Sequence, residues 1–193
     1  TDHTEALAQH PKVTFVKRVF DDFSSQKNYA ISLAKHDWVT FFDLDEEVPE
    51  ALATELVATV RSNPTAKAFR VKRDYHFMGK RIKYSGFQTD IAVRLFNKNY
   101  CKYNGKLVHE AIQTTATIGK LKHHVKHQTY KDFDNYNQKL TQYSKLQAEA
   151  LFKKNVRPNL YHFLFRPWYR FMHQYFLRFG FLDGKEGCLL YTS

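Results

Sequence analysis

The sequence predicts an α/β domain that is followed by a helical region of different composition. In residues 1–61, two short apolar segments alternate with two segments of helical periodicity. The pattern then changes to alternating strands, and after Pro158 the chain becomes rich in aromatic residues and arginine. We therefore expect one α/β domain over residues 1–130, a C-terminal helical region over 131–187, and a short tail over 188–193.

The first elements are predicted by short apolar runs and by helix signals. Residues 12–17 are apolar and β-branched, which predicts a buried strand, and a helix over 26–34 follows two serines suited to capping it. Residues 37–42 are typical of a second buried strand, and Pro49 suits the first turn of a helix that ends near Arg61. Strand, helix, strand and helix in this order predict that the two strands lie parallel in one sheet, with ligands at their carboxyl ends.

The second half of the α/β domain has strand periodicity. Residues 68–73 and 91–96 alternate between apolar and polar side chains, and Met78-Gly79-Lys80 suits a turn between strands. Residues 131–155 are polar and carry apolar side chains at helical spacing. This pattern predicts an α+β second half and a long helix after it.

Aromatic residues and arginines are interleaved between residues 157 and 180. No uninterrupted run of ~20 apolar residues occurs there, which disfavours a membrane span but allows a segment that lies in the membrane interface. Packing into a protein core is the alternative. Arginines spread around the segment favour anionic lipid over a core.

Composition limits the class of protein. The chain has 193 residues, 43% of them hydrophobic, which is enough for one globular domain with a real core. Its formal net charge of +11 predicts attraction to polyanions such as nucleic acids, anionic lipids and nucleotide diphosphates. Cys101 and Cys188 lie far apart in the sequence, which fits a reducing compartment better than a disulfide framework or a zinc knuckle.

The two ends of the sequence predict a piece of a longer protein. Thr1 is preceded by no initiator methionine, and no secretory signal follows it. Residues 188–193, Cys-Leu-Leu-Tyr-Thr-Ser, break the preceding pattern and resemble a translated sequencing adapter. We expect this tail to be artefactual and to have no function.

Asp43 and Asp45 form an Asp-x-Asp sequence at the end of a predicted strand. Two hard oxygen ligands at a sheet edge could hold Mg²⁺ or Mn²⁺ and link it to a diphosphate. Acidic pairs are also common in turns, and Glu46 and Glu47 could simply favour the dipole of the next helix. Taken alone, these residues favour an ordinary acidic turn before a helix over a metal site.

Neighbouring residues change this balance. Two segments resemble motifs of family 2 glycosyltransferases: Gln26-Lys-Asn-Tyr-Ala and Asp37-Trp-Val-Thr-Phe-Phe-Asp-Leu-Asp-Glu-Glu-Val. The bacterial lipopolysaccharide-core glucosyltransferase subgroup is the most similar. Further similar segments follow in the expected order: Asp90-x-x-x-Arg-Leu-Phe, Gly105-Lys-Leu-Val-His-Glu, His127, Lys139 with Tyr143, and Gly180-Phe-Leu-Asp-Gly. The resemblance covers nearly residues 1–187.

The resemblance implies a partial GT-A (Rossmann-like) nucleotide-sugar transferase domain with C-terminal helices. It implies an inverting enzyme that uses Mn²⁺ or Mg²⁺ and a nucleoside-diphosphate sugar. By position, Asp43 and Asp45 are the metal residues, Asp43 also contacts the donor diphosphate, and Asp2 belongs to a donor-binding loop. The family's first strand and helix have no match in this chain.

Glu110 is the first candidate for the base that takes the proton from the acceptor hydroxyl. Its place in Val-His-Glu is similar to the acidic motif in the second half of the family, and His109 could bind the acceptor. The alternatives are a solvated charge for Glu110 and a histidine at a strand end for His109.

Two further pairs are candidate site residues. Asp90 and Arg94 are four apart in an alternating strand and share a face, so Asp90 could serve as the base and Arg94 could bind an acceptor phosphate. A structural ion pair is equally compatible with this spacing. Lys27 and Asn28 open a helix from which they could reach donor phosphates, or they could lie on its surface.

His123, His124 and His127 lack companion ligands at zinc spacing, so we expect ordinary strand and loop histidines. The predicted partners are a nucleotide-sugar donor, a saccharide or glycolipid acceptor and a membrane surface, with no nucleic acid. Lipid-linked acceptors in the resembled subgroup imply a peripheral protein at the cytoplasmic, inner face of the cytoplasmic membrane. A basic nucleic-acid-binding module and a non-catalytic membrane-surface scaffold remain the alternatives.

Overall fold

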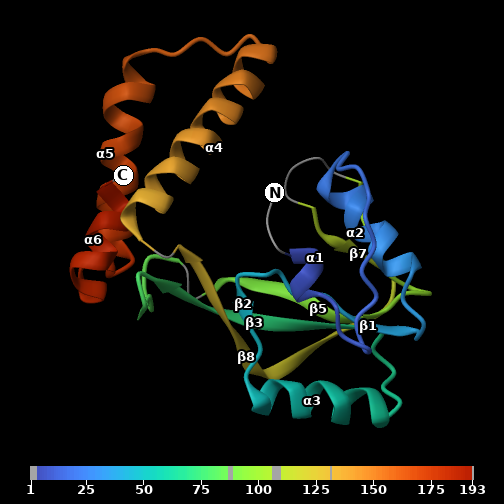
Figure 1. Cartoon of the computed structure of the whole chain (residues 1–193). Coiled ribbons are helices and arrows are strands. Elements are labelled where there is room, and N and C mark those ends of the chain that lie inside the picture. Colours follow the sequence, from blue (N-terminus) through green and yellow to red (C-terminus); the bar gives the residue numbers. More distant parts are fainter. Residues whose placement is uncertain (1–3, 87–88, 106–109, 131, 193) are drawn as a thin grey trace.

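A mixed β-sheet forms the centre of the molecule, with helices on both of its faces and a helical region at one end (Figure 1). The computed structural model describes residues 4–86, 89–105, 110–130 and 132–192. The predicted α/β class and the C-terminal helices are thereby confirmed.

The sheet has six strands in the order β1-β5-β3-β8-β2, and β4 pairs with one end of β3. The strands are β1 (Trp38–Thr40), β2 (Glu46–Glu47), β3 (Ala68–Phe77), β4 (Lys80–Arg81), β5 (Ile91–Asn97) and β8 (Ile118–Tyr130). β3 and β8 are parallel, and the other pairs are antiparallel. A second sheet consists of β6 (Lys102–Tyr103) and β7 (Ile112–Gln113).

The predicted parallel pairing of residues 12–17 with 37–42 is wrong. Residues 12–17 form no strand, and their side chains are exposed; Val13 is 50% exposed. Residues 37–42 contribute β1, which lies at the sheet edge and pairs antiparallel with β5 through Val39 and Phe96. An apolar run becomes a strand only where a neighbouring strand is available to pair with it, and the sequence pattern did not reveal which neighbour that is.

The predicted helices agree with the structure better than the predicted strand pairing does. α3 (Glu50–Arg61) begins directly after Pro49, as expected. α2 (Phe23–Ser32) begins earlier than predicted because Asp22 is its cap: the Asp22 carboxylate accepts a hydrogen bond from the Ser25 backbone N–H at 2.8 Å. A four-residue helix, α1 (Thr4–Leu7), precedes it.

Two apolar clusters hold the helices to opposite faces of the sheet. Below the sheet in Figure 1, Leu52 and Leu56 of α3 pack against Val71, Leu95 and Val125. Above it, Ile31 of α2 packs with a second buried group, which comprises Ala68, Phe96, Cys101 and Tyr103. The turn at Met78 and Gly79 is confirmed, and the positive φ angles of both residues match a two-residue hairpin turn between β3 and β4.

The C-terminal region begins with the long helix α4 (Phe133–Lys153), which rises from the end of β8 (Figure 1). The elements after it are η2 (Tyr161–Phe165), α5 (Arg166–Met172), η3 (His173–Leu177), η4 (Gly180–Asp183) and α6 (Gly184–Thr192). Tyr136 of α4 packs with Phe77 of β3 and with Leu189 and Leu190 of α6. No helix within the described residues has the length and apolar character needed to cross a membrane.

Asp183 fixes the C-terminal region to the β4–β5 connection. Its buried carboxylate accepts hydrogen bonds from the backbone N–H groups of Lys83 at 2.9 Å and Tyr84 at 3.0 Å. The Asp183 carbonyl also accepts a bond from Lys80 Nζ at 2.6 Å. The Gly-Phe-Leu-Asp-Gly segment therefore has a structural role in joining two parts of the chain.

Candidate functional site

Asp43 and Asp45 lie in the turn between β1 and β2. Their side chains are 35% and 37% exposed, so both carboxylates reach solvent. The turn is held on one side by β8, because the Asp45 carbonyl accepts a hydrogen bond from the Gln128 backbone N–H at 2.8 Å. The sequence correctly predicted an acidic pair at the carboxyl end of this strand.

Arg94 of β5 forms an ion pair with Asp43. Its Nη2 lies 2.6 Å from Asp43 Oδ2 and also bonds to Glu46 Oε1. The Arg94 side chain is only 5% exposed, and that of Glu46 is 0% exposed. A second arginine, Arg73 of β3, lies 3.6 Å from the same Glu46 oxygen through its Nη1. A buried carboxylate is stable when cations and hydrogen bonds surround it in this way.

Lys27 of α2 connects the acidic turn to Glu110. Its Nζ lies 2.7 Å from Glu110 Oε1 and 3.6 Å from Asp43 Oδ1. The ammonium group also lies over the rings of Phe41 at 5.6 Å and Tyr103 at 5.2 Å from their centroids. Residues that are distant in sequence thus meet in one group of charges.

His127 and Lys139 approach the acidic turn from the other side. His127 Nε2 lies 3.4 Å from Asp45 Oδ2. The hydrogen bond from His127 lowers the pKa of Asp45, against the opposing effect of burial, and the charges of His127 and Lys139 lower it further. In the sequence, Lys139 was noted only as a position of resemblance, and His127 was noted as such a position and as one of three strand histidines.

The charges around Asp43 keep it ionised. Burial alone would raise the pKa of Asp43, but the cationic side chains of Arg94 and Lys27 outweigh burial and hold that pKa below 3.8, its ordinary value. Both aspartates are therefore anionic at neutral pH. Two anionic oxygen groups in one solvent-exposed turn fit the coordination preferences of a divalent cation.

Several predicted site residues occupy other positions. Asp90 does not pair with Arg94; its Oδ1 lies 2.5 Å from Nη2 of Arg73. Arg94 is buried between two carboxylates, so its predicted contact with an acceptor phosphate does not fit its position. The Asn28 side chain forms two hydrogen bonds with the Tyr103 backbone, at 2.9 and 3.2 Å. These bonds give Asn28 a structural role rather than the predicted role in binding the nucleotide-sugar donor.

Asp2 and His109 lie outside the described residues. The three histidines of β8 each contact a different carboxylate: His123 lies near Glu55, His124 near Asp74 and His127 near Asp45. Among the described parts of the chain, no three His, Cys, Asp or Glu residues are grouped to hold a metal.

The sequence interpretation missed Glu46 and Arg73. Glu46 was considered only for its effect on a helix dipole. A usable signal was present in Ile91-Ala-Val-Arg-Leu-Phe, because an arginine within an apolar strand is buried and requires a carboxylate partner.

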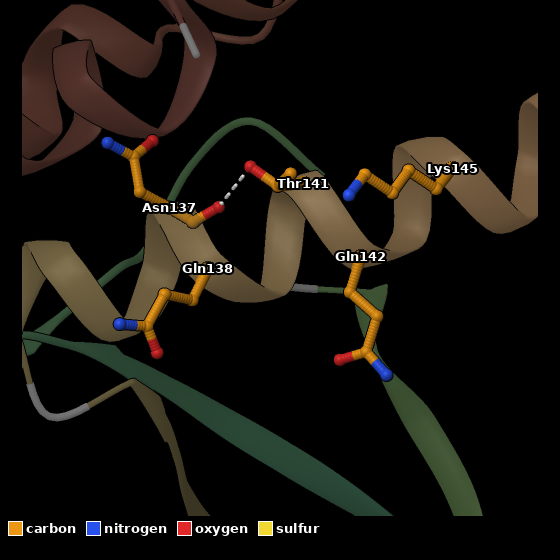
Figure 2. A pocket seen from close by; sticks show the side chains of 5 residues that line it. All are labelled: Asn137, Gln138, Thr141, Gln142 and Lys145. Carbon is orange, nitrogen blue, oxygen red and sulfur yellow. Dashed lines mark hydrogen bonds between the residues drawn. The ribbon is translucent and has the colours of Figure 1, made fainter.

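A shallow pocket of about 540 Å³ lies along α4 (Figure 2). Its lining is polar and comes from this helix alone: Asn137, Gln138, Thr141, Gln142 and Lys145. Figure 2 shows the amides of Gln138 and Gln142 on one side of the helix and Asn137 on the other, so the side chains do not converge on one point. The pocket is separate from the charged group around Asp43.

Comparison with known proteins shows similarity to glycosyltransferases. The family model for glycosyl transferase family 2 matches residues 1–122. The lipopolysaccharide core biosynthesis glycosyltransferase LpsC of Rhizobium meliloti (strain 1021) is 25% identical over 195 residues, which cover 97% of this chain and 70% of that protein.

Proposed function

Because the chain belongs to glycosyl transferase family 2, we propose that it transfers a sugar from a nucleoside-diphosphate donor to a saccharide acceptor with inversion at the anomeric carbon. The observation that carries this proposal is the position of Lys27 between Glu110 and Asp43. Because one ammonium group contacts both carboxylates, the candidate base Glu110 lies close to the candidate diphosphate-binding residue Asp43.

Asp43 and Asp45 would hold the donor diphosphate through Mn²⁺ or Mg²⁺. When bound, the cation would neutralise charge on the leaving nucleoside diphosphate. Arg94 and the buried Glu46 would fix the position of Asp43, and Lys27 would add a positive charge beside the diphosphate.

Glu110 would act as the base. The acceptor hydroxyl oxygen forms a bond to the anomeric carbon as the bond from that carbon to the diphosphate oxygen breaks, and the hydroxyl proton passes to the Glu110 carboxylate. Attack from the face opposite the leaving group inverts the configuration. Asp90 is the second candidate. Both carboxylates are ion-paired, but the partner of Glu110 is Lys27, which also lies 3.6 Å from Asp43, whereas the partner of Asp90 is Arg73.

The substitution Glu110→Gln tests this assignment. It should leave the affinity for the nucleoside-diphosphate sugar unchanged and lower turnover by ~10² or more, the usual scale for losing a general base. Asp90→Asn is the matched control, with the same loss of one carboxylate. If Asp90→Asn lowers turnover and Glu110→Gln does not, the base is Asp90.

We further propose that the acceptor is a lipid-linked lipopolysaccharide-core saccharide, as the name of LpsC suggests, and that the protein lies at the inner face of the cytoplasmic membrane. Support comes from residues 157–182, here called the aromatic segment. Phe165, Trp168 and Phe179 of this segment are 62%, 63% and 54% exposed, as the sequence predicted. Residues 150–182 contain six lysines and arginines and no acidic residue, so anionic lipid is the complementary surface.

A further inference from the structure

Lys139 is a residue of the long helix α4 to which the function proposed above assigns no role. Its side chain is half-buried, whereas Lys145 and Lys153 of the same helix are exposed. The Lys139 ammonium group lies over the ring of Tyr130, 5.1 Å from the ring centroid. An aromatic ring holds an ammonium group in place without neutralising its charge, so the group can still attract an anion. Lys139 also lies beyond residues 1–122, which the family model matches.

A β-bulge places Tyr130 on the same face of the sheet as His127. In β3, Tyr75 and Phe77 are two positions apart and share a face. Tyr75 is in register with His127 and packs against its ring at 5.8 Å between centroids. Phe77 is in register with Tyr130 and packs against it at 6.0 Å, which is possible because β8 has an extra residue between the two pairs. Tyr130 therefore lies on the side of the sheet on which His127 contacts Asp45.

The aromatic core beneath α4 fixes the position of Lys139. Tyr136, one turn earlier in the helix, is buried and packs edge-to-face against Tyr130 at 4.9 Å and against Phe77 at 5.1 Å. Its hydroxyl also donates a hydrogen bond to the Leu190 carbonyl of α6 at 3.3 Å. Residues three apart on a helix are neighbours on its surface, so Tyr136 determines where Lys139 meets Tyr130.

Asp45 of the acidic turn interacts electrostatically with both Lys139 and Tyr130. The hydrogen bond from His127 is the main cause that lowers the pKa of Asp45, and the charge of Lys139 lowers it further. Burial is the main cause that raises the pKa of Tyr130, and the negative charge of Asp45 contributes to the same shift. Helix α4 thus brings a cation to the carboxylate that is proposed to hold the donor diphosphate.

We propose that Lys139 is a further residue of the donor site and binds the diphosphate of the nucleoside-diphosphate sugar. This inference rests on the proposed glycosyl transfer and extends its site from the turn between β1 and β2 to the C-terminal region. When the bond between the anomeric carbon and the diphosphate oxygen breaks, the electron pair stays on that oxygen, and a cation beside it stabilises the developing charge. Lys27 would act from the side of Asp43, and Lys139 from the side of Asp45.

Inorganic diphosphate with Mg²⁺ serves as the probe, because it carries the charged group of the donor without a nucleoside or a sugar. In calorimetric titrations, Lys139→Gln should bind the probe ~10-fold or more weakly than the parent chain, since one charge-assisted contact is lost. Lys145→Gln is the matched control, because it removes the same charge from an exposed position of α4, and it should bind as the parent does.

Two further measurements separate the charge of Lys139 from its effect on folding. Lys139→Arg keeps the positive charge and the contact with the aromatic ring, so it should keep most of the affinity for diphosphate. Urea unfolding of Lys139→Gln should match that of the parent, because the aromatic core under α4 is unchanged. A weaker affinity in a normally folded variant would thus come from the lost charge.

Equal affinities of Lys139→Gln and the parent would overturn the inference, and so would equal losses in Lys139→Gln and Lys145→Gln, which would reflect net charge alone. A loss in Lys139→Arg as large as that in Lys139→Gln would overturn it as well. Asp45→Asn tests the donor site separately and should weaken diphosphate binding. If Asp45→Asn binds as the parent does, the proposed donor site is wrong; if Asp45→Asn loses affinity and Lys139→Gln does not, only the role of Lys139 is wrong.

Discussion

Lys27 and Glu110 form an ion pair with 2.7 Å between Nζ and Oε1, although they lie 83 positions apart in the sequence. The same ammonium group lies 3.6 Å from Asp43. Lys27 thus contacts both the proposed base, Glu110, and Asp43, which is proposed to bind the donor diphosphate. A substitution at Lys27 therefore removes a positive charge from beside both carboxylates.

The substitution Lys27→Gln should raise the pKa of Asp43, because one of the cations that lower it is removed. A carboxylate whose pKa is lower in the folded chain stabilises the fold at pH values above 3.8, and this contribution is lost as the pH falls through the folded pKa. In Lys27→Gln this contribution should therefore be smaller, and its loss should be complete at a higher pH. NMR titration of the Asp43 carboxyl carbon measures the change, and equal titration midpoints in the parent and the variant would contradict the prediction.

Replacing Arg94 should destabilise the fold strongly. In Arg94→Met, Glu46 stays buried and keeps the hydrogen bond from the Asp43 backbone N–H, but its one cationic partner among the described residues is the more distant Arg73. The free energy of unfolding should therefore fall by about 3–5 kcal/mol. Arg81→Met is the matched control, since its exposed pair with Asp74 should contribute less than about 1 kcal/mol. Urea unfolding compares them, and similar losses in both would show that burial of Glu46 is not decisive.

Asn28→Ala separates a structural role from a role in donor binding. It removes both hydrogen bonds to the buried Tyr103 backbone and should lower the free energy of unfolding by about 1–3 kcal/mol. The dissociation constant of the nucleoside-diphosphate donor should not change. Asn137→Ala, at an exposed position of α4, should leave both quantities unchanged. A weaker donor affinity with normal stability would restore Asn28 to the donor site.

The aromatic segment should bind anionic membranes. Phe165→Ala/Trp168→Ala removes two exposed rings and should weaken binding to phosphatidylglycerol vesicles ~10-fold or more, with little change in folding stability. Val57→Ala, an exposed apolar position on α3 across the sheet, is the control and should bind as the parent does. Co-sedimentation measures binding, which should weaken as salt increases. Equal binding by the aromatic variant and the control would exclude the segment from membrane contact.

Local signals in the sequence predicted the helices and the turn well. Pro49 marked the start of α3, Gly79 marked the hairpin, and helical spacing marked α4. The pairing of β1 with β5 was not predictable in this way, because strand pairing depends on contacts between distant residues. Residues 12–17 show the same limit, since their strand-like sequence finds no strand partner within the described residues.

The candidate site was predictable to the extent that it follows motifs. Asp43, Lys27 and Glu110 were each identified from a short sequence match, and the structure brings them together. The partners of Arg94 and Asp90 were not identified, because spacing along one strand says which residues share a face but not what lies opposite that face.

The parallel pairing of β3 with β8 has a consequence for the nascent chain. One edge of β3 pairs with β5 soon after synthesis, whereas the other edge must wait until β8 has left the ribosome. At ~5–20 residues per second, that wait lasts several seconds. During this interval β3 presents the unpaired backbone groups of that edge to other chains. Aggregation during translation should therefore be greatest before residue 130 emerges, which makes this the stage at which a ribosome-associated chaperone would protect the chain most.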